Sequence, residues 1–382
     1  MFTTTQRLAA SSFKLGKPSQ WARLVVNRKI DLARIRKELE NNGDLPLHVR
    51  IRLPDVEDTD DLTELLRQHV PRFLSLEIQV PVHEDAEEIV FSIGEGQPAP
   101  LLERLKITVD QRLQGPIPSF DALKNAFYPS PRLTQLNIPS NPLPEITIPL
   151  LSTVTSLTID SIQAQWDIYL YTLFDMLESM PHLQHFKFIG SDNFSFLPSA
   201  RFDFPRVIPM PNLLSVDVSA PGCGLDILRA INAPLLTTVR FDGYRPIGYQ
   251  EDFVDALTTP IPASLRRVSE RSPKITCLEM CSTVTHNPQE DYRWLLSDES
   301  FPQLEILRLN AADISDDTLV MGTSRMRKLK KLELLNCERL SGAAVKQFVE
   351  GRDKSFVVLI DACPSITEED RMTLSKSVIV ER

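Results

Sequence analysis

Two cysteines and a histidine, Cys277, Cys281 and His286, come closest in this sequence to the spacing of a metal site. Zinc binds thiolate and imidazole ligands, but a structural zinc site needs four of them and this segment offers three. Two further histidines, His182 and His185, lie three residues apart at the start of an expected strand, where they face opposite sides. We therefore expect no metal site and no cofactor.

The sequence also lacks the motifs that support common kinds of catalysis. It contains no phosphate-binding P-loop, dinucleotide-binding glycine motif, nucleophile elbow or zinc-protease helix. The acidic run at 55–61 lacks the glycine and the final glutamate of a calcium loop. It is expected instead to begin a helix that continues over 62–70, because the helix dipole favours acids there. The polar stretch at 83–88 is expected to be a solvated face. No catalytic residue is assigned, and we expect a protein that is not an enzyme.

A short apolar pattern recurs along the chain and indicates how it is organised. In each copy three apolar residues are separated by two residues and then by one, usually after a proline. Ten copies begin at positions 71, 100, 131, 152, 181, 211, 234, 273, 302 and 327. The average interval is about 28 residues, and this period with this pattern is typical of leucine-rich repeats.

The last two apolar residues of each copy are two positions apart, which is the period of a β-strand. The residue between them therefore faces the opposite side of the sheet. All ten intervening residues are polar or charged: Glu77, Lys106, Asn137, Thr158, Lys187, Asp217, Arg240, Glu279, Arg308 and Glu333. An alternating segment at 45–53 predicts an earlier strand, with His48, Arg50 and Arg52 facing outward. Each strand is thus expected to have one buried and one solvated side.

The segments between the copies often have helical spacing, as at 30–41, 174–180, 225–233 and 253–257. A repeat of one strand and one helix cannot bury its apolar face alone, but a stack of repeats can. We therefore expect an α/β fold, a leucine-rich-repeat solenoid shaped as a horseshoe-like arc. A parallel β-sheet is expected on the concave side and helices on the convex side. This domain is expected over 31–382, with about 11–12 irregular repeats.

Residues 1–30 differ from the rest, with six basic residues and no acid before Asp31. This N-terminal basic segment has the composition of a mitochondrial transit peptide, or is a frayed terminus without a targeting role. Five cysteines, a low and odd number, indicate reduced thiols in the cytoplasm or nucleus; mitochondria are the alternative. A formal net charge of −9 argues against nucleic acid as a partner, and no apolar run is long enough for a membrane span.

The outward residues of the middle strands are the best candidates for binding a protein, because they are expected to share one concave surface and mix charge signs. They are His185, Lys187, Asp217, Arg240, Asp242, Glu279, Arg308 and Asn310. Two long connections add aromatic residues of the types enriched in interface hot spots, and these would lie at the rim. They are Tyr244, Tyr249, Tyr292 and Trp294. Packing of Trp294 on the neighbouring repeat is the alternative.

The C-terminal copies carry a second pattern, a cysteine followed after two residues by Leu or Ile and then Ser or Thr, at Cys337 and Cys363. These cysteines are expected to be buried in turns as small apolar residues, without reactivity. The hydroxyl residues that follow are expected to cap helices, and Thr367 with Asp370 is expected to form a capping box.

Three features together resemble the F-box leucine-rich-repeat proteins, particularly the large fungal set. They are the proline-led repeats such as 180–188 and 232–241, the cysteine-containing C-terminal repeats, and the segment 17–51. In that segment Pro18, Trp21, Pro46 and Leu47 hold the places found after the F-box, where a strand, a helix and a second strand follow. The regular asparagine ladder of such repeats is mostly missing here, with Asn310 and Asn336 as the nearest candidates.

The resemblance implies a substrate-recognition subunit of a cullin-RING ubiquitin ligase that binds a protein on its concave face. A Skp-type adaptor and a cullin would then be partners through the F-box. That module would precede Trp21, and twenty residues cannot contain it, so either a longer form carries it or this member lacks it. The alternative function is a leucine-rich-repeat scaffold or regulator without a ligase.

Overall fold

The computed structural model describes most of the chain. The described residues are 21–27, 30–54, 59–110, 121–139, 149–160, 170–190, 206–220, 224–242, 261–282, 288–297, 299–322 and 326–381.

In these residues fourteen strands form one parallel sheet in which each strand pairs with the next one along the chain, apart from β8 and β10. The strands, in spatial order, are β1 (Ala22–Asn27), β2 (Leu47–Arg52), β3 (Phe73–Val80), β4 (Arg104–Val109), β5 (Gln135–Pro139), β6 (Ser156–Asp160), β7 (His185–Ile189), β9 (Ser215–Ser219), β11 (Thr238–Asp242), β12 (Cys277–Cys281), β13 (Ile306–Asn310), β14 (Lys331–Leu335), β15 (Val357–Asp361) and β16 (Ile379–Glu381). The short strands β8 (Ile208–Pro209) and β10 (Ile231–Asn232) pair separately.

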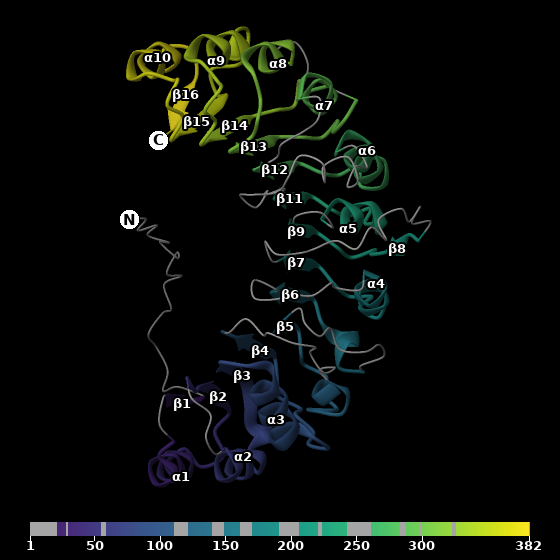
Figure 1. The fold of residues 1–382 in the computed structure, drawn as a ribbon, viewed down its shortest axis with the longest axis vertical. Helices are drawn as coiled ribbons and strands as arrows, with labels where there is room; N and C mark the ends of the chain where they lie inside the picture. Colours follow the sequence, from purple (N-terminus) through teal and green to yellow (C-terminus); the bar gives the residue numbers. More distant parts are fainter. Residues whose placement is uncertain are drawn as a thin grey trace.

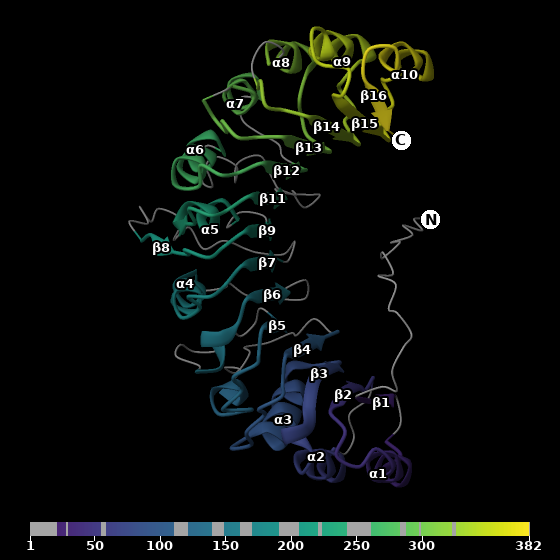
Figure 2. The same cartoon turned by 180° about the vertical axis from the view of Figure 1, so that it is seen from behind.

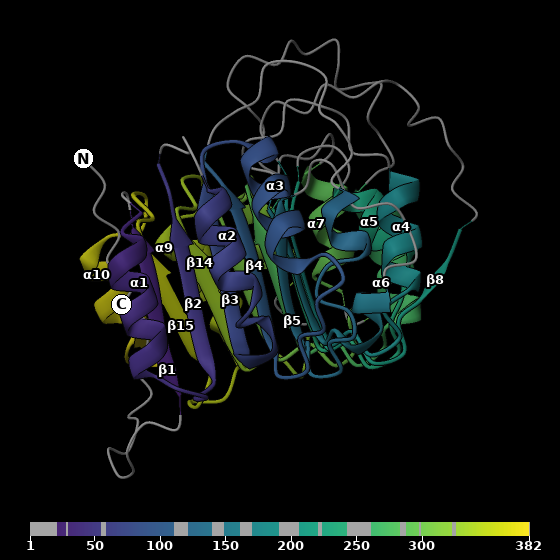
Figure 3. The same ribbon diagram turned by 90° about the horizontal axis from the view of Figure 1, so that it is seen from below.

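The helices lie on the outer side of the sheet. The described α-helices are α1 (Leu32–Asn41), α2 (Asp60–Arg67), α3 (His83–Gly94), α4 (Leu170–Glu178), α5 (Gly224–Ala230), α6 (Ile261–Arg271), α7 (Pro288–Leu295), α8 (Asp316–Met321), α9 (Gly342–Val349) and α10 (Glu368–Leu374). Short 3-10 helices lie at Val70–Arg72, Asp121–Lys124 and Pro149–Thr153. Figures 1 and 2 show the strands lining the inside of an arc and the helices forming its outside. Viewed from below, the helices lie over one face of the sheet (Figure 3).

The predicted solenoid is therefore confirmed, and all ten repeat copies contain a strand of the large sheet. Their alternation is also confirmed. On β9, for example, Val216 and Val218 are buried while Asp217 between them is half-buried on the inner side. A slip of one residue would turn these valines to solvent, so the apolar pattern fixes the register of each strand.

One core runs through the whole stack. The buried apolar residues form a single connected cluster from β1 to the segment before β16, between the sheet and the outer helices. Because each repeat packs only on its neighbours, stability in such an array is close to a sum of repeat and interface contributions. None of the described helices has the length and apolar character needed to cross a membrane.

One element differs from the sequence-based expectation, and the others agree with it where they are described. Residues 22–27, within the segment assigned as an N-terminal basic extension, form β1 and pair in register with β2. The helix at 30–41 and the strand at 45–53 are present as α1 and β2, so strand, helix and strand follow Trp21 in that order. The expected helices at 174–180 and 225–233 correspond to α4 and α5. The helix expected at 253–257 lies outside the described residues.

The C-terminal helices begin at the expected caps. Thr367 accepts a hydrogen bond from the backbone of Asp370, and the Asp370 side chain accepts one from the backbone of Thr367, which completes the predicted capping box. Ser341 caps α9 through the backbone N–H of Ala344. Such caps stabilise a helix by about 1 kcal/mol each, because they satisfy N–H groups that have no partner within the helix.

The stretch at 83–88 is only in part the solvated face that we expected, because its four acids are exposed or half-buried but its other two residues are buried. It begins α3, and its periodicity turns His83 and Ala86 into the core. Charging His83 is unfavourable here because the imidazole is buried at the positive end of a helix, and its Nδ1 has no hydrogen-bond partner in the described structure. Burial lowers the pKa of His83 to about 4.

We predict that His83 makes the protein less stable in acid. The unfolded state binds the proton first, near the ordinary pKa of 6.5, so stability falls as the pH drops from there toward about 4. Between pH 7 and 4.5 the loss is about 2 kcal/mol. Urea unfolding across this range should show a smaller loss in His83→Gln than in the unmodified protein. Equal pH dependence of the two proteins would contradict this account.

Candidate functional site

The inner face of the sheet brings the predicted binding residues together. Each strand presents up to three side chains there, and neighbouring strands align them in columns. Arg240 on β11 lies directly between Asp217 on β9 and Glu279 on β12, and Glu279 lies beside Arg308 on β13. All eight of the predicted concave residues lie on these inner columns.

The middle column contains a chain of ion pairs that we call the charge ladder, made of Lys187, Asp217, Arg240, Glu279, Arg308 and Glu333. Lys187 Nζ lies 3.0 Å from Asp217 Oδ2, and Arg240 Nη1 lies 3.0 Å from Asp217 Oδ1. Arg240 Nε donates to Glu279 at 3.1 Å, and Arg308 Nη1 lies 2.6 Å from the other Glu279 oxygen. Arg308 Nε then donates to Glu333. Cations and anions alternate without interruption across these six strands.

The ladder keeps its own charges fixed and ionised. Burial works to raise the pKa of Glu333, but the hydrogen bond and charge of Arg308 hold it below the ordinary value. The hydrogen bond to Glu333 raises the pKa of Arg308, against the effect of burial. Burial works to lower the pKa of Arg240, but the charge of Asp217 raises it above the ordinary value. These residues therefore neutralise one another and form an ordered polar floor on the inner face.

The flanking columns are held by weaker contacts. His185 Nδ1 and Ser215 Oγ are 2.8 Å apart, and Asp242 lies 4.0 Å from Arg240. Asn310 accepts a hydrogen bond of 2.9 Å from Asn336, so the two asparagines named from the sequence do contact each other.

The rim aromatics are a different matter. Tyr244 and Tyr249 lie outside the described residues. Tyr292 is 1% exposed and belongs to the core, so its assignment as a rim contact is wrong. A helix of two turns turns one side inward, and α7 places Tyr292 on that side. Trp294 is partly buried and packs edge-on against Phe301, with Arg266 over its ring, which agrees with the alternative of packing between repeats.

The two ends of the inner face differ from the ladder. At the first strands, Glu77 is shared by Arg50 at 2.5 Å and Lys106 at 3.3 Å. At the last four strands the inner face becomes partly apolar, through Ile306, Leu335, Val357, Leu359 and Ile379. These end regions were not among the residues selected from the sequence. They could have been found by aligning the first and third inner positions of each copy as well as the middle one.

The C-terminal cysteines have structural contacts. Cys337 and Cys363 follow residues with left-handed backbone, Asn336 (φ 53°) and Ala362 (φ 49°). The Cys337 thiol lies 3.5 Å from the carbonyl of Leu309 on the preceding strand, and its backbone N–H donates to Cys363 Sγ at 3.4 Å. Hydrogen bonding between the two thiols raises the pKa of Cys337 and lowers that of Cys363.

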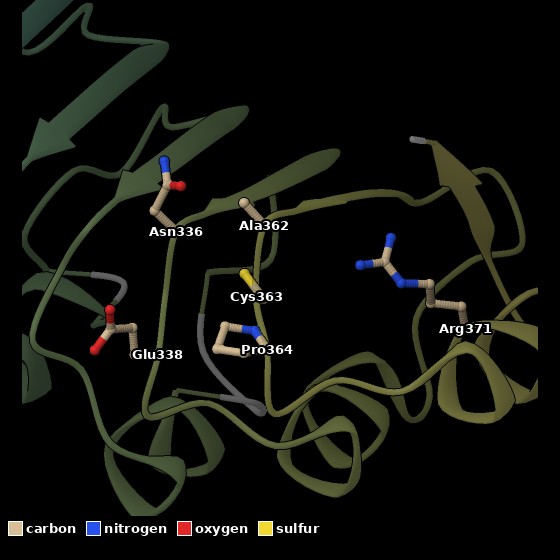
Figure 4. Close-up of a pocket in the computed structure, with 6 residues that line it drawn as sticks. All are labelled: Asn336, Glu338, Ala362, Cys363, Pro364 and Arg371. Atoms are coloured by element: carbon tan, nitrogen blue, oxygen red, sulfur yellow. The ribbon is translucent and has the colours of Figure 1, made fainter. Parts of the chain in front are cut away.

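A shallow pocket of about 370 Å³ lies beside Cys363 (Figure 4). Arg371 reaches toward it from α10 and donates to the carbonyl of Ile360 at 2.7 Å. Cys363 contributes to the lining of this pocket but is only 3% exposed. The contacts of Cys337, Cys363 and Arg371 with nearby backbone groups stabilise the turns between repeats.

Of the two cysteines considered for a metal, Cys281 is buried and Cys277 is half-buried. Burial, followed by the charge of Glu279, raises the pKa of Cys281 to about 12, and burial raises that of Cys277. The four cysteines that the structure describes are free thiols. Within the described ranges no group of three or more histidine, cysteine or acidic side chains is placed to hold a metal ion. His286 lies outside those ranges.

Comparison with known proteins identifies no family. No protein-family model matches this chain, and no curated protein matches it. Among solved structures, one similar chain is a protein from Bacteroides fragilis, with 13% sequence identity and a TM-score of 0.37. The match covers 93% of this chain and 73% of that one. At this TM-score the likeness supports no argument about function.

Proposed function

We propose that this protein is a binding module that holds a partner protein against the inner face of its sheet. The observation that carries the proposal is the ordered inner face itself, which none of the described helices covers. The described helices all lie outside the arc, whereas the fourteen strands line its hollow (Figure 1). The inner side chains of these strands are aligned between neighbours and are mostly polar up to β12.

The chemistry of this face suits a protein surface. The charge ladder fixes these side chains before binding, so less side-chain conformational entropy is lost when a partner binds. The apolar side chains at β13–β16 supply the kind of surface found at the centre of protein interfaces, with the ladder as a polar margin. We further propose that the protein is in the cytoplasm or nucleus, where the four described free thiols would stay reduced.

The finer form of the proposal is that the partner is a ubiquitin-ligase substrate. It rests on the resemblance to F-box leucine-rich-repeat proteins, and the order of β1, α1 and β2 after Trp21 agrees with that resemblance. A scaffold or regulator without a ligase would use the same inner face. Co-purification of a Skp-type adaptor with the protein supports the ligase role, and its absence favours the scaffold.

Site-specific photo-crosslinking tests the inner face directly. A photoreactive residue is placed at Thr158 or Ser219 on the inner face, and at Lys346 or Arg267 on outer helices as matched controls. Cross-linking in cells should give the same protein adduct from both inner positions and not from the outer ones. Adducts that form only from the outer positions would rule out the inner face as the binding surface.

A further inference from the structure

The first four strands of the inner face carry an excess of positive charge. Their inner positions hold five basic residues, which we call the cationic face: Arg23, Arg50, Arg52, Arg104 and Lys106. The same positions hold one carboxylate, Glu77, and Asp110 follows directly after β4. This excess stands out in a chain whose formal net charge is −9.

The hydrogen bonds of this face differ from those of the charge ladder in one specific way. In the ladder, the Nε of Arg240 and of Arg308 donates to a glutamate on the next strand. In the cationic face, Arg52 Nε donates to Gln79 at 2.7 Å and Arg104 Nε donates to Gln135 at 2.7 Å. The geometry is equivalent, but an uncharged amide stands where the ladder has a carboxylate.

The amides orient these arginines without neutralising them. Arg23 makes no hydrogen bond or ion pair with any described residue, and Glu77 is already shared between Arg50 and Lys106. The amide nitrogen of Gln79 donates to Asp110 Oδ2 at 3.0 Å, so the Asp110 carboxylate is bound by this glutamine. The guanidinium groups of Arg23, Arg52 and Arg104 are thus exposed on one surface, and none of them contacts a carboxylate of the described residues.

His48 lies within this cluster of basic residues, and their charges affect its pKa. It lies between Arg23 on β1 and Ser75 on β3, and its Nδ1 is 2.7 Å from Ser75 Oγ. Burial lowers the pKa of His48, and the charges of Arg104 and Arg23 lower it further, against Glu103. Trp21 packs edge-on against this ring at 4.8 Å and remains 45% exposed, so an aromatic surface borders the cationic face.

We propose that the cationic face binds an acidic segment of the partner protein, through carboxylate or phosphate groups held by Arg23, Arg52 and Arg104. The proposal rests on the proposed function and names the chemistry of one part of the partner. Guanidinium forks bind both kinds of anion with two parallel hydrogen bonds. Strands about 4.8 Å apart give β1–β4 a width of roughly 14 Å, which matches about four extended residues.

A short patch of this size fits a peptide better than a nucleic acid. Proteins that follow a nucleic-acid backbone need cations along many phosphates, and here the next strands, β5 and β6, present no basic residue to the inner face. The charge ladder beyond them is neutralised within itself.

The glutamines permit a test that leaves every arginine in place. In the double variant Gln79→Glu/Gln135→Glu, Arg52 and Arg104 each receive a carboxylate partner, as Arg240 and Arg308 already have in the charge ladder. Gln135→Glu alone should fold at least as well as the unmodified protein, as followed by thermal unfolding. Gln79→Glu removes the hydrogen bonds that Gln79 donates to Asp110, so the double variant is compared with the Gln135→Glu single variant in both unfolding and binding. The control variant Gln184→Glu has the same kind of charge change at an exposed position before β7.

Binding is measured by fluorescence anisotropy with the full chain and labelled peptides of about ten residues, enough to cross the face. The probes are alternating Gly and Glu, the same peptide with phosphoserine for Glu, the same with Gln, and a single-stranded oligonucleotide. The Glu or phosphoserine peptide should bind, and more weakly in high salt. The double variant should lose about tenfold in affinity or more, and Gln184→Glu should not. The affinities of the Glu and phosphoserine peptides then show whether the cationic face prefers carboxylate or phosphate groups.

Three results would overturn the proposal: equal binding of the Gln peptide, unchanged binding by the double variant, or tighter binding of the oligonucleotide than of both acidic peptides. The cross-linking experiment separates this proposal from the more general one. Cross-links from Thr158 without binding of acidic peptides remove only the cationic-face proposal. Binding of acidic peptides without inner-face cross-links removes the proposed function.

Discussion

Replacement of Phe188 by alanine is expected to cost about 4 kcal/mol, the largest effect that we predict for a single side chain. Phe188 is completely buried on β7, where it lies between Ile159 of β6 and Val218 of β9. Loss of the ring removes apolar burial and leaves a cavity that the neighbouring strands cannot fill. Because repeats are stabilised through their neighbours, the cavity should weaken β6 and β9 as well.

Hydrogen exchange measures this effect locally, which matters because a long repeat array need not unfold in one step. In Phe188→Ala, amides of β6, β7 and β9 should exchange faster, while those of β2 and β3 should not change. Thr158→Ala, on the inner side of β6, is the control and should cost less than about 1 kcal/mol. Equal protection in Phe188→Ala and the control would contradict a continuous core between repeats.

The second large effect is expected from the centre of the charge ladder. Glu279→Gln should cost about 2 kcal/mol, because it leaves Arg240 and Arg308 on either side of an uncharged residue. The Glu279 side chain is 15% exposed, so water cannot fully replace its role. The arginines are about one third exposed, and this keeps the loss below that of a fully buried pair.

The same substitution at an exposed ion pair provides the control. Glu305 lies 2.8 Å from Lys330, and both side chains are well exposed. Glu305→Gln should cost less than about 1 kcal/mol, and added salt should reduce that loss further. Thermal unfolding of the two variants at low and high salt makes the comparison. If Glu279→Gln were no more destabilising than Glu305→Gln, the ladder would be a surface feature without a structural role.

The sequence contained more of this site than was taken from it. The strand period and the polar middle residue of each copy were enough to predict the sheet, its inner face and the column that holds Asp217, Arg240 and Glu279. Written in order, those residues already alternate in charge, so mutual pairing could have been inferred. Mixed charge signs in this column suit a partner's surface, but the structure shows that these side chains first pair with one another.

Other features could not be obtained from a single repeat pattern. The burial of Tyr292 and His83 depends on which side of a helix faces the sheet. The eight residues of α7 give too few apolar positions to decide it, and at the start of α3 the stretch 83–88 has Ala86 as its one apolar residue. The pairing of β1 with β2 joins residues on either side of a helix, so the basic composition of 1–30 concealed a strand. The contrast between glutamine and glutamate beside the arginines becomes visible only when neighbouring strands are aligned.

The most direct test of the central claim is the reactivity of native lysines in the complex with the cross-linked partner. Lys106 and Lys187 lie on the inner face, while Lys37 on α1 and Lys346 on α9 lie outside. Mass spectrometry of acetylation rates, with and without the partner, compares all four in one experiment. We predict slower acetylation of Lys106 and Lys187 in the complex and unchanged rates at Lys37 and Lys346. Protection of the two outer lysines, with the inner two unaffected, would contradict binding on the inner face.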